Sequence, residues 1–258
     1  MQAKRTWILL RGLIREQRHW ESFPDVFQSY FPDDEIILYD FPGNGQRYKE
    51  KSATSIIDMV DDVRPFALNR SAHQPVYIVA LSLGGMVAVE WMSRYPEDCA
   101  GAVLISTSLR GLNPFYQRLL PSNYPAIIQS LIFPGDLHQK ESRNMDLVSN
   151  IIASDPLKRD ATIKHWVSYA EQCPVSASNA LRQLLAATRF QGPAHRPDVP
   201  ILVLRSLGDQ LVSPQCSLSL ARHWGLALQT HKSAGHDIPL DDGDWVCQKI
   251  RFWLTNNN

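Results

Sequence analysis

The segment Val76–Met86 constrains the fold more than any other part of the chain. An apolar run, Pro75–Ala80, passes into a helical pattern, Leu83–Tyr95, through the single residue Ser82. A continuous apolar run is typical of a parallel strand covered on both faces. A strand followed directly by a helix is the building unit of a parallel α/β sheet. The segment therefore predicts an α/β protein with a serine between a buried strand and a helix.

Other short apolar runs alternate with helical patterns along the chain, which indicates repeated βαβ units. The expected strands are Thr6–Leu10, Glu35–Tyr39, Pro75–Ala80, Ala100–Ile105, Ile201–Arg205 and Leu226–His231. The expected helices between and after them are Ser55–Leu68, Leu83–Tyr95, Pro214–Trp224 and Asp244–Leu254. We therefore expect a mostly parallel sheet of about six strands with helices on both faces.

Residues 110–195 interrupt this alternation. They contain several prolines and no run with strand character, whereas Asp155–Tyr169 and Ala177–Arg189 have helical spacing. We expect two pieces of chain, 1–109 and 196–258, to form one α/β core. Residues 110–195 are expected to form a helical cap inserted into it.

Composition excludes several classes of protein. Lys+Arg and Asp+Glu are 26 each in 258 residues, so the formal net charge is zero and no overall field attracts nucleic acid or an anionic membrane. The apolar stretch before Arg11 is too short for a signal sequence, and no stretch could span a bilayer. The four scattered cysteines form no Cys-x-x-Cys pair. We expect a soluble, cytoplasmic monomer or dimer with reduced thiols.

Ser82 has the surroundings that a nucleophilic serine needs. A tight strand-to-helix turn exposes the hydroxyl at a helix N-terminus, where free N–H groups stabilise developing negative charge. The residues two before and two after the serine must be small, and here they are Ala80 and Gly84. The same five residues also fit an ordinary βα turn with a helix-capping serine. The choice depends on the rest of the chain.

A carboxylate and an imidazole follow the last two expected strands. Asp209 comes just after Ile201–Arg205, and His236 comes just after Leu226–His231. Carboxyl ends of parallel strands share one edge of a sheet, so Ser82, Asp209 and His236 are expected to converge there. His236 would accept the Ser82 proton, and Asp209 would orient and stabilise the imidazole.

With these motifs in this order, the chain resembles the α/β-hydrolase fold superfamily. The turn Asp40–Gly45 is similar to a structural turn of that family. The resemblance implies that Ser82 is the nucleophile, Asp209 the triad acid and His236 the base. It also implies that the backbone N–H groups of Leu83 and Leu13 form the oxyanion hole, although Arg11-Gly12 stands where the family has His-Gly.

The function expected from this resemblance is hydrolysis of a carboxylic ester or thioester of a small to medium substrate through an acyl-enzyme. Serine at position 82 disfavours the dehalogenase and epoxide-hydrolase branches. Carbon–carbon-bond hydrolysis, lyase or acyltransferase chemistry, and a non-catalytic ligand receptor stay open as alternatives. There is no metal-ligand spacing and no dinucleotide fingerprint, so no metal and no cofactor are implied.

Basic residues gather in the loop after the first expected strand, namely Arg11, Arg15, Arg18 and His19. They could bind an anionic substrate or an acyl-carrier partner. We favour a solvated loop whose charge is partly offset by Glu16 and Glu21.

Two further groups of polar and aromatic residues are given structural interpretations. The first is four acids near His236, which we expect to form the first turn of the last helix: Asp237, Asp241, Asp242 and Asp244. The second is a set of cap residues, which we expect in the core more than in a pocket: His165, Trp166 and Tyr169.

Overall fold

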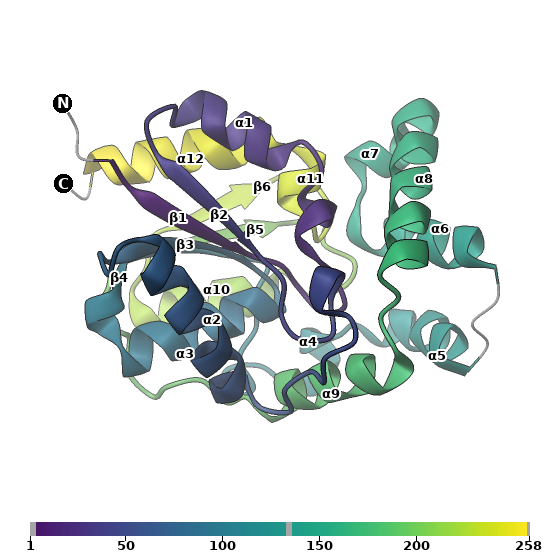
Figure 1. Ribbon diagram of the computed structural model, residues 1–258, viewed down its shortest axis with the longest axis horizontal. Coiled ribbons are helices and arrows are strands. Elements are labelled where there is room, and N and C mark those ends of the chain that lie inside the picture. Colours follow the sequence, from purple (N-terminus) through teal and green to yellow (C-terminus); the bar gives the residue numbers. More distant parts are fainter. Residues whose placement is uncertain (1–3, 133–135, 257–258) are drawn as a thin grey trace.

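The computed structural model describes residues 4–132 and 136–256. Six strands form one sheet in the order β2-β1-β3-β4-β5-β6, and every pairing is parallel (Figure 1). The strands are β1 (Thr6–Leu10), β2 (Glu35–Tyr39), β3 (Val76–Leu81), β4 (Cys99–Ile105), β5 (Ile201–Ser206) and β6 (Leu228–His231). The sequence-based prediction of a parallel α/β sheet of about six strands is confirmed.

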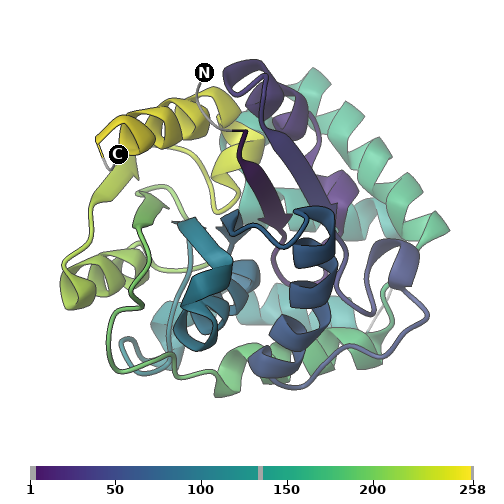
Figure 2. The same ribbon diagram turned by 60° about the vertical axis from the view of Figure 1, so that its left-hand side comes forward.

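Helices cover both faces of this sheet (Figures 1 and 2). One face carries α2 (Ile56–Arg70), α3 (Leu83–Arg94) and α10 (Gln215–Trp224), and the other carries α1 (Phe23–Tyr30) and α12 (Gly243–Asn256). Successive strand residues point to opposite faces. Ile8 and Leu10 therefore pack under the first group of helices and Trp7 and Leu9 under the second, all fully buried. Two-sided burial explains why the strands are continuous apolar runs.

Between β4 and β5, where an insertion was expected, the described residues form six helices. They are α4 (Phe115–Arg118), α5 (Tyr124–Ile132), α6 (Leu137–Val148), α7 (Ile151–Ser154), α8 (Pro156–Gln172) and α9 (Ala177–Arg189). Asp155 caps α8 by accepting from the N–H groups of Leu157 and Lys158, and Ser176 caps α9. We call residues 110–195 the helical insertion. Its helices α6 to α8 stand beside the carboxyl end of the sheet (Figure 1).

The sequence analysis did not anticipate every helix. It missed α1, which has Pro24 in its first turn and the buried pair Phe23 and Phe27 on one face. It also missed α5 and α6 within the insertion, and the short α11 (Ile238–Asp241). Short turns of 3-10 helix complete the chain at η1 (Gln17–Trp20), η2 (Gly45–Arg47), η3 (Pro96–Asp98) and η4 (Pro121–Asn123). No helix among residues 4–132 and 136–256 is long and apolar enough to cross a membrane.

Candidate active site

Ser82 occupies a strained turn between β3 and α3. Its backbone has φ 55° and ψ −112°, a conformation that non-glycine residues rarely adopt. Such strain costs about 1–3 kcal/mol and persists only where the surroundings fix it. Here the Ser82 N–H donates to the Ile105 carbonyl at 2.9 Å, and the Ser82 carbonyl accepts from Thr107 Oγ1 at 2.5 Å. The end of neighbouring strand β4 and the segment that follows it therefore hold the turn in place.

Close backbone packing surrounds this turn. A Cβ atom added at Gly84 would lie 2.4 Å from the Leu10 carbonyl oxygen, so only glycine lets α3 approach the end of β1. A Cβ atom added at Gly12 would lie 3.2 Å from Ser82 Cβ and 3.7 Å from Ser82 Oγ. The loop after β1 therefore passes directly beside the serine. Ala80 is fully buried, so its methyl group is accommodated where the family pattern has glycine.

His236 and Asp209 form a buried pair. His236 Nδ1 lies 2.8 Å from Asp209 Oδ2, and both side chains are almost wholly excluded from solvent. The other oxygen, Asp209 Oδ1, accepts from the backbone N–H groups of Leu211 and Val212 at 2.9 Å each. Because the carboxylate accepts, the proton of a neutral His236 is on Nδ1 and Nε2 is left with a free lone pair. This is the tautomer that can accept a proton.

The charge environment of His236 raises its pKa above the ordinary 6.5. Burial lowers the pKa, and Arg11 adds to that effect. The charge of Asp209, its hydrogen bond and the charge of Asp237 raise the pKa by more. The buried imidazole is therefore a stronger base than an exposed histidine.

Ser82, Asp209 and His236 all follow carboxyl ends of parallel strands, at the edge of the sheet beside the helical insertion (Figure 1). Ser82 is half-buried, and its Oγ makes no hydrogen bond with any residue that the structure describes. The hydroxyl is therefore available to another molecule.

Two backbone N–H groups next to Ser82 are also unbonded within the described residues. Leu83 is the first residue of α3, and its N–H has no partner inside the helix. Leu13 follows Gly12 in the loop beside the serine, and its N–H makes no hydrogen bond with a described residue. Both groups are free to donate to a developing oxyanion.

The expectation that the basic residues form a solvated loop is wrong. Arg11 is only 2% exposed and binds Asp237 through both carboxylate oxygens, at 2.6 and 3.4 Å. Arg15 binds Glu141 of α6 at 2.9 Å, with its guanidinium 4.2 Å from the centre of the Trp166 ring. The reason is tertiary: the segment after His236 supplies the partner of Arg11 and the helical insertion supplies that of Arg15, both from more than 100 positions away.

The remaining members of this cluster are also paired. Arg18 binds Glu16 at 2.6 Å and Gln172 of α8 at 2.6 Å, with its guanidinium 4.5 Å from the centre of the Tyr169 ring. His19 is buried beside Arg15 and Trp166, and burial and the arginines hold its pKa well below 6.5. Each arginine of the cluster therefore has a carboxylate partner, while Arg11 Nε and Arg18 Nη2 make no hydrogen bond within the described residues.

The four acids after His236 do not share one helix turn, so that expectation is wrong for two of them. Asp242 does cap α12 by accepting from the Trp245 N–H at 2.9 Å, and Asp244 is in the first turn of that helix. Asp237 instead caps α11 and binds Arg11. Asp241 accepts from the Gly235 N–H at 2.7 Å and from several groups at the start of α7. Its carboxylate thereby joins the His236 loop to the helical insertion.

Of the three cap residues expected in the core, only Trp166 is buried; Tyr169 is half-buried, and the expectation is wrong for His165, whose side chain is 59% exposed. Trp166 is fully buried with Met145 and Ile163, and its Nε1–H donates to Glu21 Oε1 at 3.0 Å. His165 lies 3.0 Å from the other oxygen of Glu21. These contacts fasten α8 to the loop after η1.

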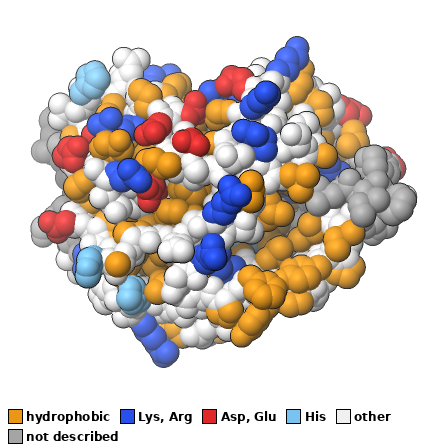
Figure 3. Space-filling view, turned by 90° about the horizontal axis from the view of Figure 1, so that it is seen from below, with side chains coloured by type: hydrophobic (Ala, Val, Ile, Leu, Met, Phe, Trp, Pro, Cys, Tyr) orange, Lys and Arg blue, Asp and Glu red, His pale blue; other side chains and the backbone are white. Residues whose placement is uncertain are grey.

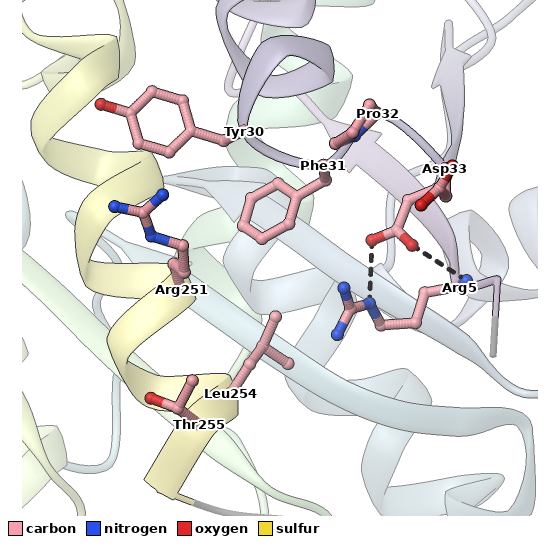
Figure 4. Close-up of a pocket in the computed structure, with 9 residues that line it drawn as sticks. Arg5, Tyr30, Phe31, Pro32, Asp33, Arg251, Leu254 and Thr255 are labelled. Carbon is pink, nitrogen blue, oxygen red and sulfur yellow. Dashed lines mark hydrogen bonds and ion pairs between the residues drawn. The ribbon is translucent and has the colours of Figure 1, made fainter. Parts of the chain in front are cut away.

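A hollow near the amino end of β1, opposite the carboxyl ends that carry Ser82, Asp209 and His236, has no contact with this site. Arg5, Asp34, Phe31 and Arg251 are among the residues that line it (Figure 4). Arg5 precedes β1 and Ser82 follows β3, so the hollow and Ser82 lie at opposite ends of parallel strands. Among the described residues, no group of three or more histidine, cysteine, aspartate or glutamate side chains could hold a metal ion.

The fold agrees with comparisons to known proteins. The family described as serine aminopeptidase S33 matches residues 28–243. The chain belongs to this family. This S33-family protein is therefore a hydrolase of the α/β-hydrolase fold, as the resemblance in its sequence implied.

Individual relatives of this S33-family hydrolase differ in activity. It is 23% identical to a proline iminopeptidase of Pestalotiopsis fici over 95% of its own chain and 88% of the relative. An esterase of a Rhodococcus species has a similar structure, with a TM-score of 0.78, 14% identity and coverage of 99% and 92% of the two chains. An enol-lactonase of Burkholderia xenovorans has a TM-score of 0.77, 15% identity and coverage of 98% and 91%.

Proposed function

We propose that the protein is a serine hydrolase of carboxylic esters or thioesters, with Ser82 as nucleophile, His236 as general base and Asp209 as the residue that orients it. The observation that carries the proposal is the buried His236–Asp209 pair, 2.8 Å apart, at the sheet edge where the strained Ser82 turn also lies. The orientation of the pair leaves Nε2 of His236 free to accept a proton.

The reaction proceeds in two acyl-transfer steps. Ser82 Oγ attacks the substrate carbonyl carbon while its proton passes to His236 Nε2, and the carbonyl oxygen becomes an oxyanion. The N–H groups of Leu83 and Leu13 donate to that oxyanion. The carbon–oxygen or carbon–sulfur bond breaks, and His236 protonates the leaving group. A water molecule, deprotonated by His236, then attacks the acyl carbon, and His236 returns the proton to Ser82 Oγ as the acid leaves.

The charge pairing favours an uncharged acyl substrate over a peptide with a free amino terminus. An aminopeptidase needs a carboxylate that is available to the substrate ammonium group. Three carboxylates near this edge, Asp237, Glu141 and Glu16, already bind arginines, and Glu21 already accepts from Trp166. Capture of a substrate amine by one of these four carboxylates would cost it an existing partner.

The surface of the helical insertion also suits an apolar substrate. Exposed large apolar side chains of its helices include Phe115 (73%), Ile128 (54%) and Leu181 (53%). Figure 3 shows a face on which apolar side chains form a broad band next to basic ones. We propose that residues 110–195 act as the cap of the site and that residues 1–109 and 196–258 form its catalytic core.

An active-site fluorophosphonate tests the nucleophile. We expect covalent labelling of Ser82 in the native protein and no labelling in S82A, because the probe reacts with a serine only when a base and an oxyanion hole activate it. Peptide mapping identifies the modified residue. An unmodified Ser82 in folded protein would contradict the proposal and favour the non-catalytic receptor.

A substrate panel tests the class of bond. We expect turnover of p-nitrophenyl esters and of the matching thioesters, and little turnover of proline p-nitroanilide. S82A is the control for background hydrolysis. Faster cleavage of the anilide would assign the protein to the peptidases of its family. Labelling of Ser82 without turnover of esters or anilides would favour carbon–carbon-bond hydrolysis.

A further inference from the structure

Gln183 is a polar residue of the insertion that is wholly inaccessible to solvent. It lies on α9, yet its side chain reaches two segments of the α/β core. Gln183 Oε1 accepts from the Ile14 N–H at 2.8 Å, and Nε2 donates to Asn44 Oδ1 at 2.8 Å and to Ser52 Oγ at 3.0 Å. Every hydrogen-bonding atom of this amide is therefore directed at the core.

The partner Ile14 is held in a strained conformation. Its φ is 55°, which is an outlier for a β-branched residue. Ile14 directly follows Leu13, the proposed second oxyanion donor, in the loop that passes beside Ser82. The orientation of the Leu13 amide depends on the backbone angles of this loop. A hydrogen bond that stabilises Ile14 in its strained state therefore also fixes the Leu13 N–H.

The turn Asp40–Gly45 completes the same network. Asn44 is fully buried, and its Nδ2 donates to the Arg15 carbonyl at 3.1 Å while its Oδ1 accepts from Gln183. Asp40 Oδ1 accepts from the Gln17 N–H at 2.7 Å. The loop from Gly12 to Gln17 is thus held at Ile14, Arg15 and Gln17. Of these three bonds, the one at Ile14 comes from the insertion.

We propose that Gln183 is a positioning residue for residues 12–17, which we call the oxyanion loop. The insertion would then complete the catalytic apparatus as well as cover it. The proposal rests on the proposed function, because it assigns the Leu13 N–H to the oxyanion. Loss of Gln183 would allow Ile14 to relax and the Leu13 N–H to turn away from Ser82. Transition-state stabilisation would fall, whereas binding of the ground-state substrate would change little.

Asn179 provides a matched control on the same helix. It is buried one turn before Gln183 and also ties α9 to the core, through the Ser52 N–H at 3.0 Å and the Glu50 carbonyl at 2.9 Å. Unlike Gln183, it makes no hydrogen bond to residues 12–17. A substitution at Asn179 weakens the attachment of α9 and leaves the oxyanion loop in place.

The rate of fluorophosphonate labelling measures the oxyanion site without a known substrate. Wild type, S82A, Gln183→Met and Asn179→Leu are compared at pH 8, with the melting temperature of each variant. We expect Q183M to react about 10- to 100-fold more slowly, since deletion of a whole oxyanion donor costs about 10²- to 10³-fold. We expect N179L to stay within about threefold of wild type. With p-nitrophenyl butyrate, Q183M should lower kcat and leave KM nearly constant.

A second variant separates a role of Gln183 in positioning the Leu13 N–H from a role in attaching α9 to the core. Ile14→Gly removes the strain at φ 55°, because glycine adopts positive φ freely. We expect Q183M to cost less in the I14G background than in wild type, whereas a purely structural role would give equal losses. Gln183→Asn, one methylene too short to reach Ile14, replaces Q183M if that variant does not fold.

The outcomes distinguish the two proposals. Labelling of wild type together with unchanged labelling of folded Q183M would overturn the role of Gln183 and leave the serine hydrolase intact. Equal losses in Q183M and N179L, or a change in KM alone, would also overturn it. Absence of labelling on wild-type Ser82 would overturn the proposed function and this inference with it.

Discussion

Arg11 and Asp237 form a buried ion pair that joins the two loops of the candidate site. Arg11 Nη2 lies 2.6 Å from Asp237 Oδ2, and both side chains are less than 4% exposed. Arg11 directly follows β1 and precedes Gly12, and Asp237 is the residue after His236. The pair therefore fixes the spacing of the loops that carry the proposed oxyanion donor and the proposed base. It also places opposite charges beside the imidazole.

The pH dependence of activity should reflect the raised pKa of His236. Neutral imidazole is the active form of a general base, so activity rises as pH passes upward through this pKa. We expect the acid limb of kcat/KM for a p-nitrophenyl ester to lie above pH 6.5, the ordinary value. An acid limb below pH 6.5 would contradict the assignment of His236 or of its charged neighbours.

Substitutions of Arg11 and of Asp237 should move the acid limb of the pH profile in opposite directions. Arg11 lowers the pKa of His236 and Asp237 raises it, so R11M should shift the limb to higher pH and D237N to lower pH. Each variant leaves an unpaired buried group and should lose about 3–5 kcal/mol of stability. The control is R5M, which breaks the Arg5–Asp34 pair (2.8 Å) at the opposite edge of the sheet. It should lower the melting temperature and leave the pH profile unchanged.

Asp209 is expected to be the acid that orients His236. D209N should lower kcat by about 10³- to 10⁴-fold at an unchanged fold, because the amide disfavours the required imidazole tautomer. D242N is the matched control, since Asp242 caps α12 and does not contact His236. Near-native turnover by D209N would indicate that a different carboxylate is the partner.

Gly84, two residues after Ser82, should be irreplaceable for steric reasons. G84A places a methyl carbon 2.4 Å from the Leu10 carbonyl oxygen, a distance too short for van der Waals contact, so the backbone must shift. Overpacking of this kind costs about 1–3 kcal/mol or more. We expect a lower melting temperature and slower labelling of Ser82. G225A is the control variant, because a Cβ atom added at Gly225 meets nothing within 4 Å. We expect it to change the melting temperature at most and to leave the labelling of Ser82 unchanged.

His19 should make the fold sensitive to acid. Its folded-state pKa is held well below 6.5 by burial and by Arg15 and Arg11, whereas the unfolded chain binds a proton near pH 6.5. Stability from the neutral ring is therefore complete above about pH 6.5 and falls as pH decreases. The raised pKa of His236 acts in the opposite direction, as it favours the folded state at low pH and loses that effect as pH rises.

A variant isolates the contribution of His19. Chemical denaturation between pH 5 and pH 8 should show that wild type loses more stability on acidification than H19Q. The His236 contribution is common to both proteins and cancels in the difference. Parallel stability curves for the two proteins would show that His19 is protonated equally in both states, contrary to its buried position beside Arg15.

Residue patterns that depend on near neighbours were predictable. The six strands follow from apolar runs, and the turn at Ser82 follows from a strand and a helix separated by one residue flanked by Ala80 and Gly84. Parallel pairing then places the residues after β5 and β6, including Asp209 and His236, at the same edge. These inferences need only local periodicity and one rule of topology.

Contacts across long separations in the chain were not predictable in this way. The charges of Arg11 and Arg15 indicate a solvated loop when they are considered locally, because Asp237 and Glu141 lie 226 and 126 positions away. The same holds for Gln183, a polar residue on a helical pattern, whose bond to Ile14 spans 169 positions. The amino-acid sequence by itself determined the sheet, the serine turn and the order of the candidate triad. Only the tertiary structure decided which charges are buried and which residue of the insertion binds the Ile14 N–H, because burial and pairing depend on packing between distant segments.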